Sequence, residues 1–415
     1  MVKLREYQSD VLDECILSLH TRNKCLMVLP TGGGKTQIMS FIIDRMNLKT
    51  LVVAHTKELI TQLEETIYKN SPHLRKSVTV CTIQKACRRS WADIDFLIID
   101  EAHRSASKSY RKLISSTAKD AYLLGATATP FRKDEQSIFE IFGFPDKAVT
   151  ILDLIDQGYL CDIRGYRFKT NTVLTGIRRS KGDFQSKSLA AVIDCKDRND
   201  LIVTCYKNKA RGKKTIAFCA NIEHCEELSK TFRDQGISSK SIHGNLSLSE
   251  RKKRLKEFKG GEISVLTNCQ ILTEGFDEPS IECILLCRPT FSKGLYIQMI
   301  GRGLRIFPGK VECLAIEFTD NLFDICSLES ILECGNSNFK MSNGETISAG
   351  GKRHKAELIE GDHEVVEEEI YIIPKDIYKR MATTFQKKIL DDNNISYSKK
   401  LTEHGANTLI ATKFN

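Results

Sequence analysis

The residues with the clearest capacity for chemistry lie at positions 29–36, which read Leu-Pro-Thr-Gly-Gly-Gly-Lys-Thr. Glycines let backbone N–H groups turn toward a bound anion, and a helix that follows adds positive charge from its N-terminus. The Lys35 ammonium suits β- and γ-phosphates, and the Thr36 hydroxyl suits Mg²⁺. The usual pattern has glycine where this chain has Leu29. The segment predicts a phosphate-binding loop, and the alternative is a glycine-rich turn without a ligand.

A second chemical group is the acidic pair Asp100 and Glu101, which directly follows the apolar run 96–99. Two adjacent carboxylates at the end of a buried strand are costly unless they are used. Asp100 is suited to hold the Mg²⁺ shell, and Glu101 to activate an attacking water. The alternative is a chance acidic turn.

Short apolar runs predict the strands that position these groups. They cover residues 25–29, 51–55, 78–82, 96–99 and 122–124. Helical patterns separate them: Ile38, Phe41, Ile42 and Met46 form one apolar face after the lysine, and another helix opens near Leu4. Parallel sheets of this kind bind ligands at the carboxyl ends of their strands. The pattern indicates an α/β protein with a doubly wound parallel sheet.

Bulk composition limits the possible classes. A chain of 415 residues with 41% hydrophobic residues has room for two or three domains. The net charge of +9, from 62 Lys+Arg against 53 Asp+Glu, fits a polyanionic partner and equally a solvated surface. Fifteen cysteines without a C-x-x-C pair indicate a reducing compartment, the cytoplasm or the nucleus, and no zinc site. No apolar run has the length of a membrane span, so we expect no membrane partner.

The second half of the chain carries a further ordered series of motifs. Strand-like runs at 216–219 and 265–268 precede Thr-Glu-Gly-Phe-Asp at 273–277 and Gln-Met-Ile-Gly-Arg-Gly-Leu-Arg at 298–305. With the glycine-rich loop, Asp-Glu-Ala-His at 100–103 and Gly-Ala-Thr-Ala-Thr-Pro at 125–130, the chain resembles superfamily 2 helicases and translocases over about residues 4–320. It looks similar to the members with the Asp-Glu-Ala-His signature, including phage and viral branch-migration helicases and DNA-repair helicases.

This resemblance implies two tandem RecA-like doubly wound parallel-sheet domains that bind ATP and Mg²⁺ between them. The nucleotide-binding residues would be Arg5, Gln8, Thr31, Gly32, Gly33, Gly34, Lys35, Thr36, Asp100, Gly275 and Asp277, with Gln8 reading adenine and with Thr36 and Asp100 on the metal. Catalysis would use Glu101, Gln298, Arg302 and Arg305, the two arginines acting on the transition-state charge. Thr127 and Thr129 would couple hydrolysis to motion. A nucleic-acid groove would include His55, Thr56, Gln84, Asn221, His243 and Thr267.

The expected domains are residues 1–150, the first RecA-like domain, and residues 191–330, the second. A linker is expected at 151–190 and a small C-terminal extension at 331–415. The linker contains the basic run 178–182, which fits either contact with a duplex backbone or, more commonly, a solvated loop. In the extension, Pro374 begins an expected helix with Ile377, Met381, Phe385 and Ile389 on one face.

The resulting expectation is an ATP-dependent DNA helicase or translocase, a monomeric motor acting on single-stranded, forked or branched DNA. Replication, recombination and repair, including branch migration, are the expected settings, in the cytoplasm or in a host cell if the source is a phage or virus. An ATP-dependent RNA helicase is one alternative. A motor subunit serving a nuclease partner is the other, although no nuclease motif of carboxylates and lysine is present.

Overall fold

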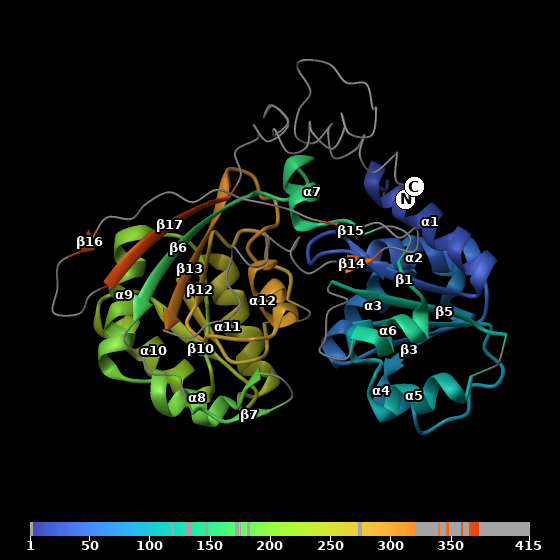
Figure 1. Cartoon of the computed structure of the whole chain (residues 1–415), viewed down its shortest axis with the longest axis horizontal. Coiled ribbons are helices and arrows are strands. Elements are labelled where there is room, and N and C mark those ends of the chain that lie inside the picture. The colour runs from blue at the N-terminus through green and yellow to red at the C-terminus, as the bar shows by residue number, and fades with distance from the viewer. Residues whose placement is uncertain are drawn as a thin grey trace, which may run out of the picture.

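The computed structural model describes residues 3–117, 120–128, 135–145, 148–170, 174, 176–180, 183–272, 276–320, 339–340, 346–347, 358–359 and 365–372. Two α/β domains lie side by side, with α7 (Ile151–Asp156) between them (Figure 1). Within these ranges no helix is both long and apolar enough to cross a membrane. The cysteines of these ranges are all free thiols.

The first sheet contains the five strands predicted for this half of the chain, all parallel, in the order β1-β5-β4-β2-β3. Their bounds are β1 (Lys24–Val28), β2 (Thr50–Ala54), β3 (Val78–Thr82), β4 (Phe96–Asp100) and β5 (Tyr122–Thr127). Successive side chains on a strand point to opposite faces of a sheet. Accordingly, Cys25 and Met27 pack into one hydrophobic cluster, and Leu26 and Val28 into another.

Helices cover both faces of this first sheet, which explains why its strands are continuous apolar runs. On one side lie α1 (Glu6–Arg22), α2 (Lys35–Met46) and α3 (Lys57–Asn70). On the other lie α4 (Ile83–Ala86), α5 (Lys108–Ser115) and α6 (Glu135–Phe142). Short 3₁₀ turns, η1 (Pro72–Lys76) and η2 (Ala102–Arg104), follow α3 and β4. The predicted apolar face of α2 is present, with Ile38 and Ile42 fully buried.

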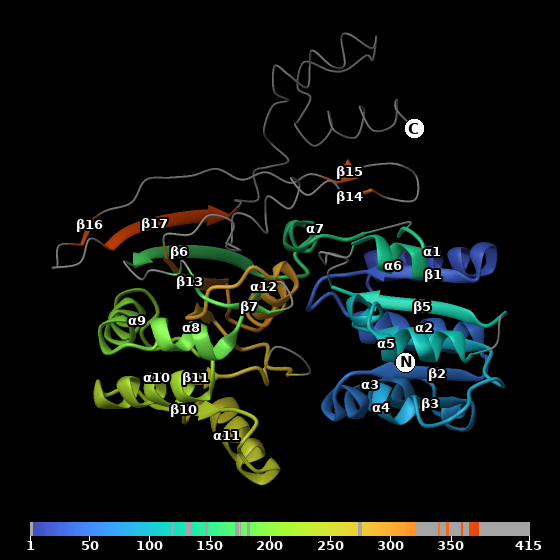
Figure 2. The same ribbon diagram turned by 60° about the horizontal axis from the view of Figure 1, so that its bottom comes forward.

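The second sheet has eight strands in the order β10-β11-β9-β12-β13-β6-β17-β16. The parallel ones are β6 (Asp162–Thr170), β9 (Thr215–Phe218), β10 (Ser239–Ile242), β11 (Val265–Asn268), β12 (Cys283–Leu286) and β13 (Glu312–Asp320). At one border β17 (Val365–Ile372) pairs antiparallel with β6, and β16 (Leu358–Ile359) pairs antiparallel with β17. Figure 2 shows this border opposite the one formed by β10 and α11.

Four helices cover the two faces of the second sheet: α9 (Lys196–Lys209) and α10 (Ile222–Asp234) on one, α11 (Leu248–Gly260) and α12 (Lys293–Ile300) on the other. The remaining elements are β7 (Arg179–Ser180), β8 (Asp183–Phe184), α8 (Ser186–Ile193), β14 (Phe339–Lys340) and β15 (Thr346–Ile347). The helix expected from Pro374 lies outside the described residues.

Strand β6 corrects the expected linker at 151–190. It pairs in parallel with β13 along its whole length, from Asp162 opposite Glu312 to Thr170 opposite Asp320. A buried ion pair reinforces this pairing, because Nε of Arg167 lies 3.2 Å from Oε2 of Glu317. Residues 162–170 therefore belong to the second sheet. The sequence run looked like a strand, but its partner, far along the chain, could not be read from the sequence.

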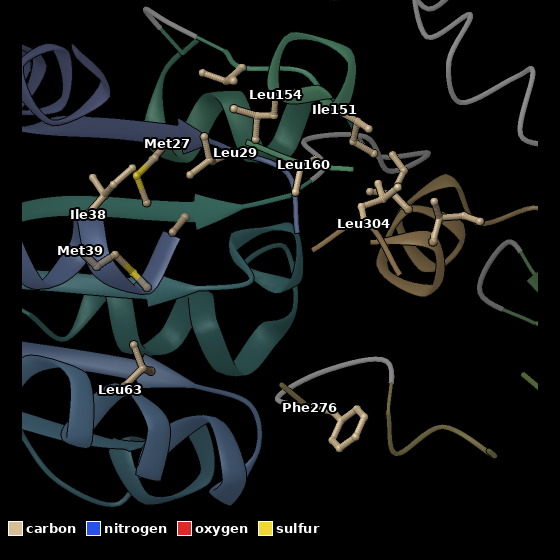
Figure 3. Packing of buried hydrophobic residues seen from close by; sticks show 14 of the residues in the cluster. Met27, Leu29, Ile38, Met39, Leu63, Ile151, Leu154, Leu160, Phe276 and Leu304 are labelled. Carbon is tan, nitrogen blue, oxygen red and sulfur yellow. The ribbon is translucent and has the colours of Figure 1, made fainter. Parts of the chain in front are cut away.

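A hydrophobic cluster continues from the first domain into the second. Leu154 of α7 and Leu160, in the turn after it, lie between Leu29 of the first domain and Leu304 of the second (Figure 3). A backbone hydrogen bond from Cys161 N to Leu304 O, 2.8 Å long, fastens this turn to the second domain. The connection between the domains is therefore a packed segment in contact with both.

The close packing at Gly125 of β5 yields a stability prediction. A Cβ at this position would lie 2.8 Å from the Phe142 ring and 2.9 Å from Cβ of Ala102. Gly125→Ala should lower the free energy of unfolding by about 1–3 kcal/mol, because overpacking displaces α6 or η2. Gly260→Ala is the control, since the nearest atom to its Cβ is 3.7 Å away. Thermal unfolding of both variants measures the difference; equal midpoints would contradict this packing.

Candidate nucleotide site and nucleic-acid interface

The glycine-rich loop joins β1 to α2 and has the backbone of an anion cradle. Gly32 and Gly34 have φ of 88° and 84°, a region that other residues rarely adopt. Helix α2 begins at Lys35, so its N-terminal amides open toward the loop. Leu29, which departs from the usual pattern, is fully buried under the loop, with Cγ 2.8 Å from the position of a Cβ at Gly33. Leucine here thus fills the space beneath the loop.

Lys35 points back along the loop in this structure. Its Nζ donates a hydrogen bond of 3.2 Å to the carbonyl oxygen of Leu29. The hydroxyl-bearing Thr36 follows in the first turn of α2 and is half-buried. The cation is thus held across the cradle by one neutral acceptor, which a more strongly charged acceptor can replace.

The first residues of α1 brace the loop from the side. The hydroxyl of Tyr7 donates to the carbonyl oxygen of Gly33 at 2.8 Å, and Nε2 of Gln8 donates to the same atom at 3.2 Å. Oε1 of Gln8 accepts from Arg5 N at 3.0 Å. The Gln8 amide therefore supports the loop, and its predicted reading of adenine stays a prediction. A side chain at Gly34 would collide with this amide.

Two tyrosines at this site were not predicted. Tyr7 contacts Gly33 as described, and its ring lies 4.8 Å from the ring of Tyr159, which follows α7. The Arg5 guanidinium lies 5.0 Å over the Tyr159 ring. Burial raises the pKa of the Tyr7 hydroxyl, which keeps it a hydrogen-bond donor. The sequence signal that could have identified Tyr7 was a tyrosine next to Gln8 at the start of the first predicted helix.

The acidic pair ends β4 as expected. Glu101 has φ 52° and ψ 52°, an uncommon left-handed conformation for a residue with a side chain. Its backbone N–H donates to Oδ1 of Asp100 at 3.0 Å, and both side chains are nearly buried. This turn directs two carboxylates away from the end of the strand, and oxygen donors of this kind suit Mg²⁺. In the described ranges no cluster of three or more His, Cys, Asp or Glu side chains has the geometry to hold a metal ion.

His103 connects Glu101 to β5. Its Nδ1 lies 3.2 Å from Oε2 of Glu101 and 3.3 Å from the Thr127 hydroxyl. Burial acts to raise the pKa of the Glu101 carboxyl, but the hydrogen bond to His103 and the charge of Lys35 outweigh it and lower the pKa. Glu101 is therefore ionised at neutral pH. His103 thus lies between the Glu101 carboxylate and Thr127. The coupling of hydrolysis to motion by Thr127 stays a prediction, and Thr129 lies outside the described residues.

The predicted arginines of the second domain converge on one backbone atom. Nη1 of Arg302 donates to the carbonyl oxygen of Phe276 at 2.7 Å, and Nη1 of Arg305 donates to it at 3.2 Å. Arg305 also pairs with Asp277. Burial lowers the pKa of Arg305, which remains a cation throughout the physiological range. Gln298 is buried on α12 beside them, and Gly275 lies outside the described residues.

The arginine-bearing segment touches the phosphate loop across the two domains. A Cβ at Gly301 would lie 2.5 Å from Cβ of Thr31. A Cβ at Gly32 would lie 3.1 Å from Leu160 and 3.6 Å from Cγ of Arg305. Sequence positions about 270 residues apart therefore meet in one place, as expected for a site shared by two domains. Neither glycine leaves space for a larger residue.

Two of the predicted groove residues have their side-chain oxygens engaged as helix caps. The hydroxyl of Thr56 accepts from Leu59 N at 3.2 Å, at the start of α3. Oδ1 of Asn221 accepts from His224 N at 2.9 Å, at the start of α10. Such caps fix exposed helix N-termini at the ends of strands, where backbone amides suit phosphate groups. Their contact with nucleic acid stays a prediction.

Thr267 of β11 lies inside the second domain, and its contact with nucleic acid stays a prediction. Its side chain is fully buried, and its hydroxyl donates to the Cys225 carbonyl oxygen at 2.7 Å, because this residue of β11 faces α10. His243 is also buried, with Nε2 3.1 Å from a carboxylate oxygen of Glu226. Gln84 is exposed on α4, and His55 is half-buried after β2. Of the six residues, Gln84 is thus the most accessible side chain.

Comparisons with known proteins identify two domain types in the chain. The family described as "Type III restriction enzyme, res subunit" matches residues 1–132. The family described as "Helicase conserved C-terminal domain" matches residues 197–307. The two matches fall on the two sheets.

Relatives are similar over both domains. The "Putative ATP-dependent helicase IRC3" of Saccharomyces cerevisiae is 35% identical, over 76% of this chain and 51% of that protein. The "DNA 3'-5' translocase XPB2" of Sulfurisphaera tokodaii is 25% identical, over 73% of this chain and 79% of its own length. The chain thus spans about half the length of the yeast relative.

A solved structure supports the fold. A fragment of a putative HsdR subunit of a type I restriction enzyme from Vibrio vulnificus aligns with a TM-score of 0.60 at 21% identity, covering 76% of this chain and 64% of that one. At this identity the likeness concerns the arrangement of two parallel-sheet domains, as expected from the sequence.

The contact between Thr31 and Gly301 gives a test of the shared site. Gly301→Ala places a methyl group against the phosphate loop and should force the domains apart by a fraction of an ångström or more. Misplacement of reacting groups by about 1 Å costs on the order of a hundredfold in rate, so ATP hydrolysis should fall sharply. Gly260→Ala is the control and should hydrolyse ATP as the parent does. Normal hydrolysis by Gly301→Ala would exclude this contact from the active arrangement.

Proposed function

Because the chain belongs to the superfamily 2 helicases, we propose that it is an ATP-dependent DNA helicase or translocase. The observation that carries this proposal is the meeting of Thr31 in the phosphate loop with Gly301, beside Arg302 and Arg305. Hydrolysis at a site built from two domains requires those domains to close. Each turnover thereby becomes a cycle of relative motion, which is what a motor needs.

The first domain supplies the groups that hold the nucleotide. Lys35 would leave the Leu29 carbonyl and pair with phosphate oxygens, a stronger acceptor. The amides after Gly32 and Gly34 would surround the phosphates, and Thr36 with Asp100 would complete the shell of Mg²⁺. When bound, Mg²⁺ neutralises charge on the phosphates. The buried carboxylate of Asp100 at a strand end fits this assignment.

The remaining charged groups would carry the chemical step. Glu101 is ionised and lies beside the cradle, so it is placed to orient a water and accept its proton. Arg302 and Arg305 would stabilise charge that develops on the transferred phosphoryl group, with Gln298 beside them. Both arginines donate to the Phe276 carbonyl, a neutral acceptor that phosphate can replace, and Arg305 also pairs with Asp277.

DNA as the polymer is supported by the XPB2 relative, whose name specifies a DNA translocase, and by the basic net charge. We extend the proposal to a monomer acting on single-stranded, forked or branched DNA in the cytoplasm. Repair, recombination and branch migration are the processes that use such substrates. The cycle of domain closure is the same whichever of these substrates is bound.

A second candidate is a motor subunit that serves a nuclease partner. It is supported by the family description for residues 1–132, which names a subunit of a restriction enzyme. The chemistry of the site is the same in both cases. A complete helicase would separate DNA strands as the purified chain, whereas a motor subunit would need its partner protein.

The proposed function is tested by ATP hydrolysis with single-stranded, duplex, forked and four-way DNA, each compared with matched RNA. We expect DNA to stimulate hydrolysis by at least about tenfold and independently of its base sequence, since the motor would contact the polymer backbone. RNA should stimulate hydrolysis much less if the motor distinguishes DNA from RNA by the 2′-hydroxyl group. Strand separation by the same preparation distinguishes a complete helicase from a subunit. Stimulation by RNA and not by DNA would reject a DNA helicase and favour an RNA helicase.

The role of Glu101 gives a prediction about chemistry. Glu101→Gln keeps the size of the side chain but removes the proton acceptor, so turnover should fall about a hundredfold or more while nucleotide affinity is retained. The matched control is Glu140→Gln, an exposed glutamate on α6, which should leave turnover unchanged. Fluorescent-nucleotide titration and steady-state hydrolysis measure the two quantities. Equal turnover in both variants would remove Glu101 from the mechanism.

A further inference from the structure

Strands β7 and β8 form a short antiparallel hairpin ahead of the second sheet, with Arg179 opposite Phe184 and Ser180 opposite Asp183. The segment carries the basic run that the sequence singled out, Arg-Arg-Ser-Lys-Gly at 178–182. The nucleotide site does not use it. Its position and its attachment to the second domain indicate a role separate from nucleotide binding.

Strand β8 of the hairpin is fastened to the residues that follow β12. The Asp183 carboxylate accepts hydrogen bonds from Arg288 Nη2 at 3.1 Å, from the Thr290 hydroxyl at 2.7 Å and from Phe291 N at 2.9 Å. Arg288 is almost fully buried. Three donors on one carboxylate hold the strand in a single position. The hairpin is thus a fixed part of the second domain.

Aromatic packing reinforces the same attachment. The ring of Phe184 is buried and lies 4.7 Å from the ring of Phe291. Phe184 also shares a hydrophobic cluster with Ala220, the residue between β9 and Asn221. Because β9 and β12 are parallel neighbours, their carboxyl ends form one edge of the sheet. The hairpin therefore sits on the edge that holds the α10 N-terminus, where nucleic-acid contacts are expected.

The outward side of the hairpin is cationic. Arg178 and Arg179 are both exposed, and within the described ranges no ion pair joins either of them to a carboxylate. The Arg179 guanidinium lies 4.0 Å over the Phe291 ring. Stacking fixes the plane of a guanidinium and leaves its N–H edge free to donate, which is the geometry that suits phosphate.

The hairpin lies on a side of the molecule to which both domains contribute elements. Figure 1 shows β7 and α8 at the lower border of the second domain, and α4 and α5 at the lower border of the first. Helix α4 bears the exposed Gln84. A polymer that spans both domains along this border would pass both elements.

We propose that Arg178 and Arg179 of the β7–β8 hairpin bind phosphate groups of a DNA strand, as a backbone contact of the second domain separate from the ATP site. The proposal rests on the proposed function and deepens it by naming where the strand is held. The contact is to phosphates, so it carries no base preference. A fixed cationic hairpin on a moving domain transmits that motion to the strand.

The test is DNA binding by Arg178→Ala/Arg179→Ala as a function of salt, with fluorescent single-stranded and duplex oligonucleotides. Loss of two phosphate contacts should lower the slope of log K against log[salt] by roughly 1.4 for single strands and 1.8 for duplex. If affinities converge with the parent near 1 M salt, affinity at 0.1 M should fall about 25-fold for single strands and about 60-fold for duplex. A slope change close to the expected value on one form of DNA and none on the other identifies the form that the hairpin holds.

A matched control lies at the opposite edge of the same sheet. Lys209 stacks 4.7 Å over the Tyr166 ring, and Arg211 is exposed just before β9. Lys209→Ala/Arg211→Ala removes the same charge and should leave the salt slope unchanged. Arg178→Lys/Arg179→Lys should retain most of the slope, since counterion release depends on charge. Thermal unfolding of each variant reports on folding.

Two results would overturn the inference: a parental salt slope in Arg178→Ala/Arg179→Ala, or an equal loss in the control at the opposite edge. Failure of the parent protein to bind or respond to any DNA is a different result, because it would reject the proposed function itself. Equal losses on RNA and DNA would keep the phosphate contact and remove its restriction to DNA.

Discussion

The contact on which the structure depends is the packing of a glycine-rich loop against a second glycine-bearing segment from the other domain. Gly32 faces Leu160 and Arg305, and Gly301 faces Thr31. Backbones approach this closely only where side chains are missing. The rest of the fold keeps these two segments in contact: the two sheets, the helices on their faces and the packed turn after α7. Because protein interiors are close-packed, a small shift at this contact must be taken up by movement of whole domains.

The cations of the site share one arrangement. Lys35 rests on the carbonyl of Leu29, and Arg302 and Arg305 rest on the carbonyl of Phe276. Lys35 and Arg302 thus donate to neutral oxygens of their own domains, whereas Arg305 also pairs with the Asp277 carboxylate. Oε2 of the Glu101 carboxylate lies 3.2 Å from Nδ1 of His103. A neutral acceptor preserves the position of a cation without cancelling its charge. The site keeps its net attraction for an anion while its side chains stay ordered.

The sequence was sufficient for the five strands of the first sheet, because parallel strands covered on both faces are continuous apolar runs. It was also sufficient for the polar residues at the ends of those strands, since a parallel sheet gathers them at one edge. It was not sufficient for the place of β6, because residues 164–168 look like a strand but their pairing with β13 is set by the fold. For Thr267, a four-residue run does not reveal which face each side chain occupies. Tyr7 and Tyr159 meet only in three dimensions.

The position of β6 has a consequence for how the chain acquires its fold. It precedes the other strands of the second sheet in sequence but pairs with β13, and Arg167 meets Glu317 across a separation of 150 residues. The first sheet can form as soon as its own strands are available, whereas the second stays open beside β6 until β13 arrives. Long-range pairing of this kind slows folding and exposes unpaired strand edges in the meantime. During synthesis, β6 is therefore the segment of the described sheets most dependent on protection from aggregation.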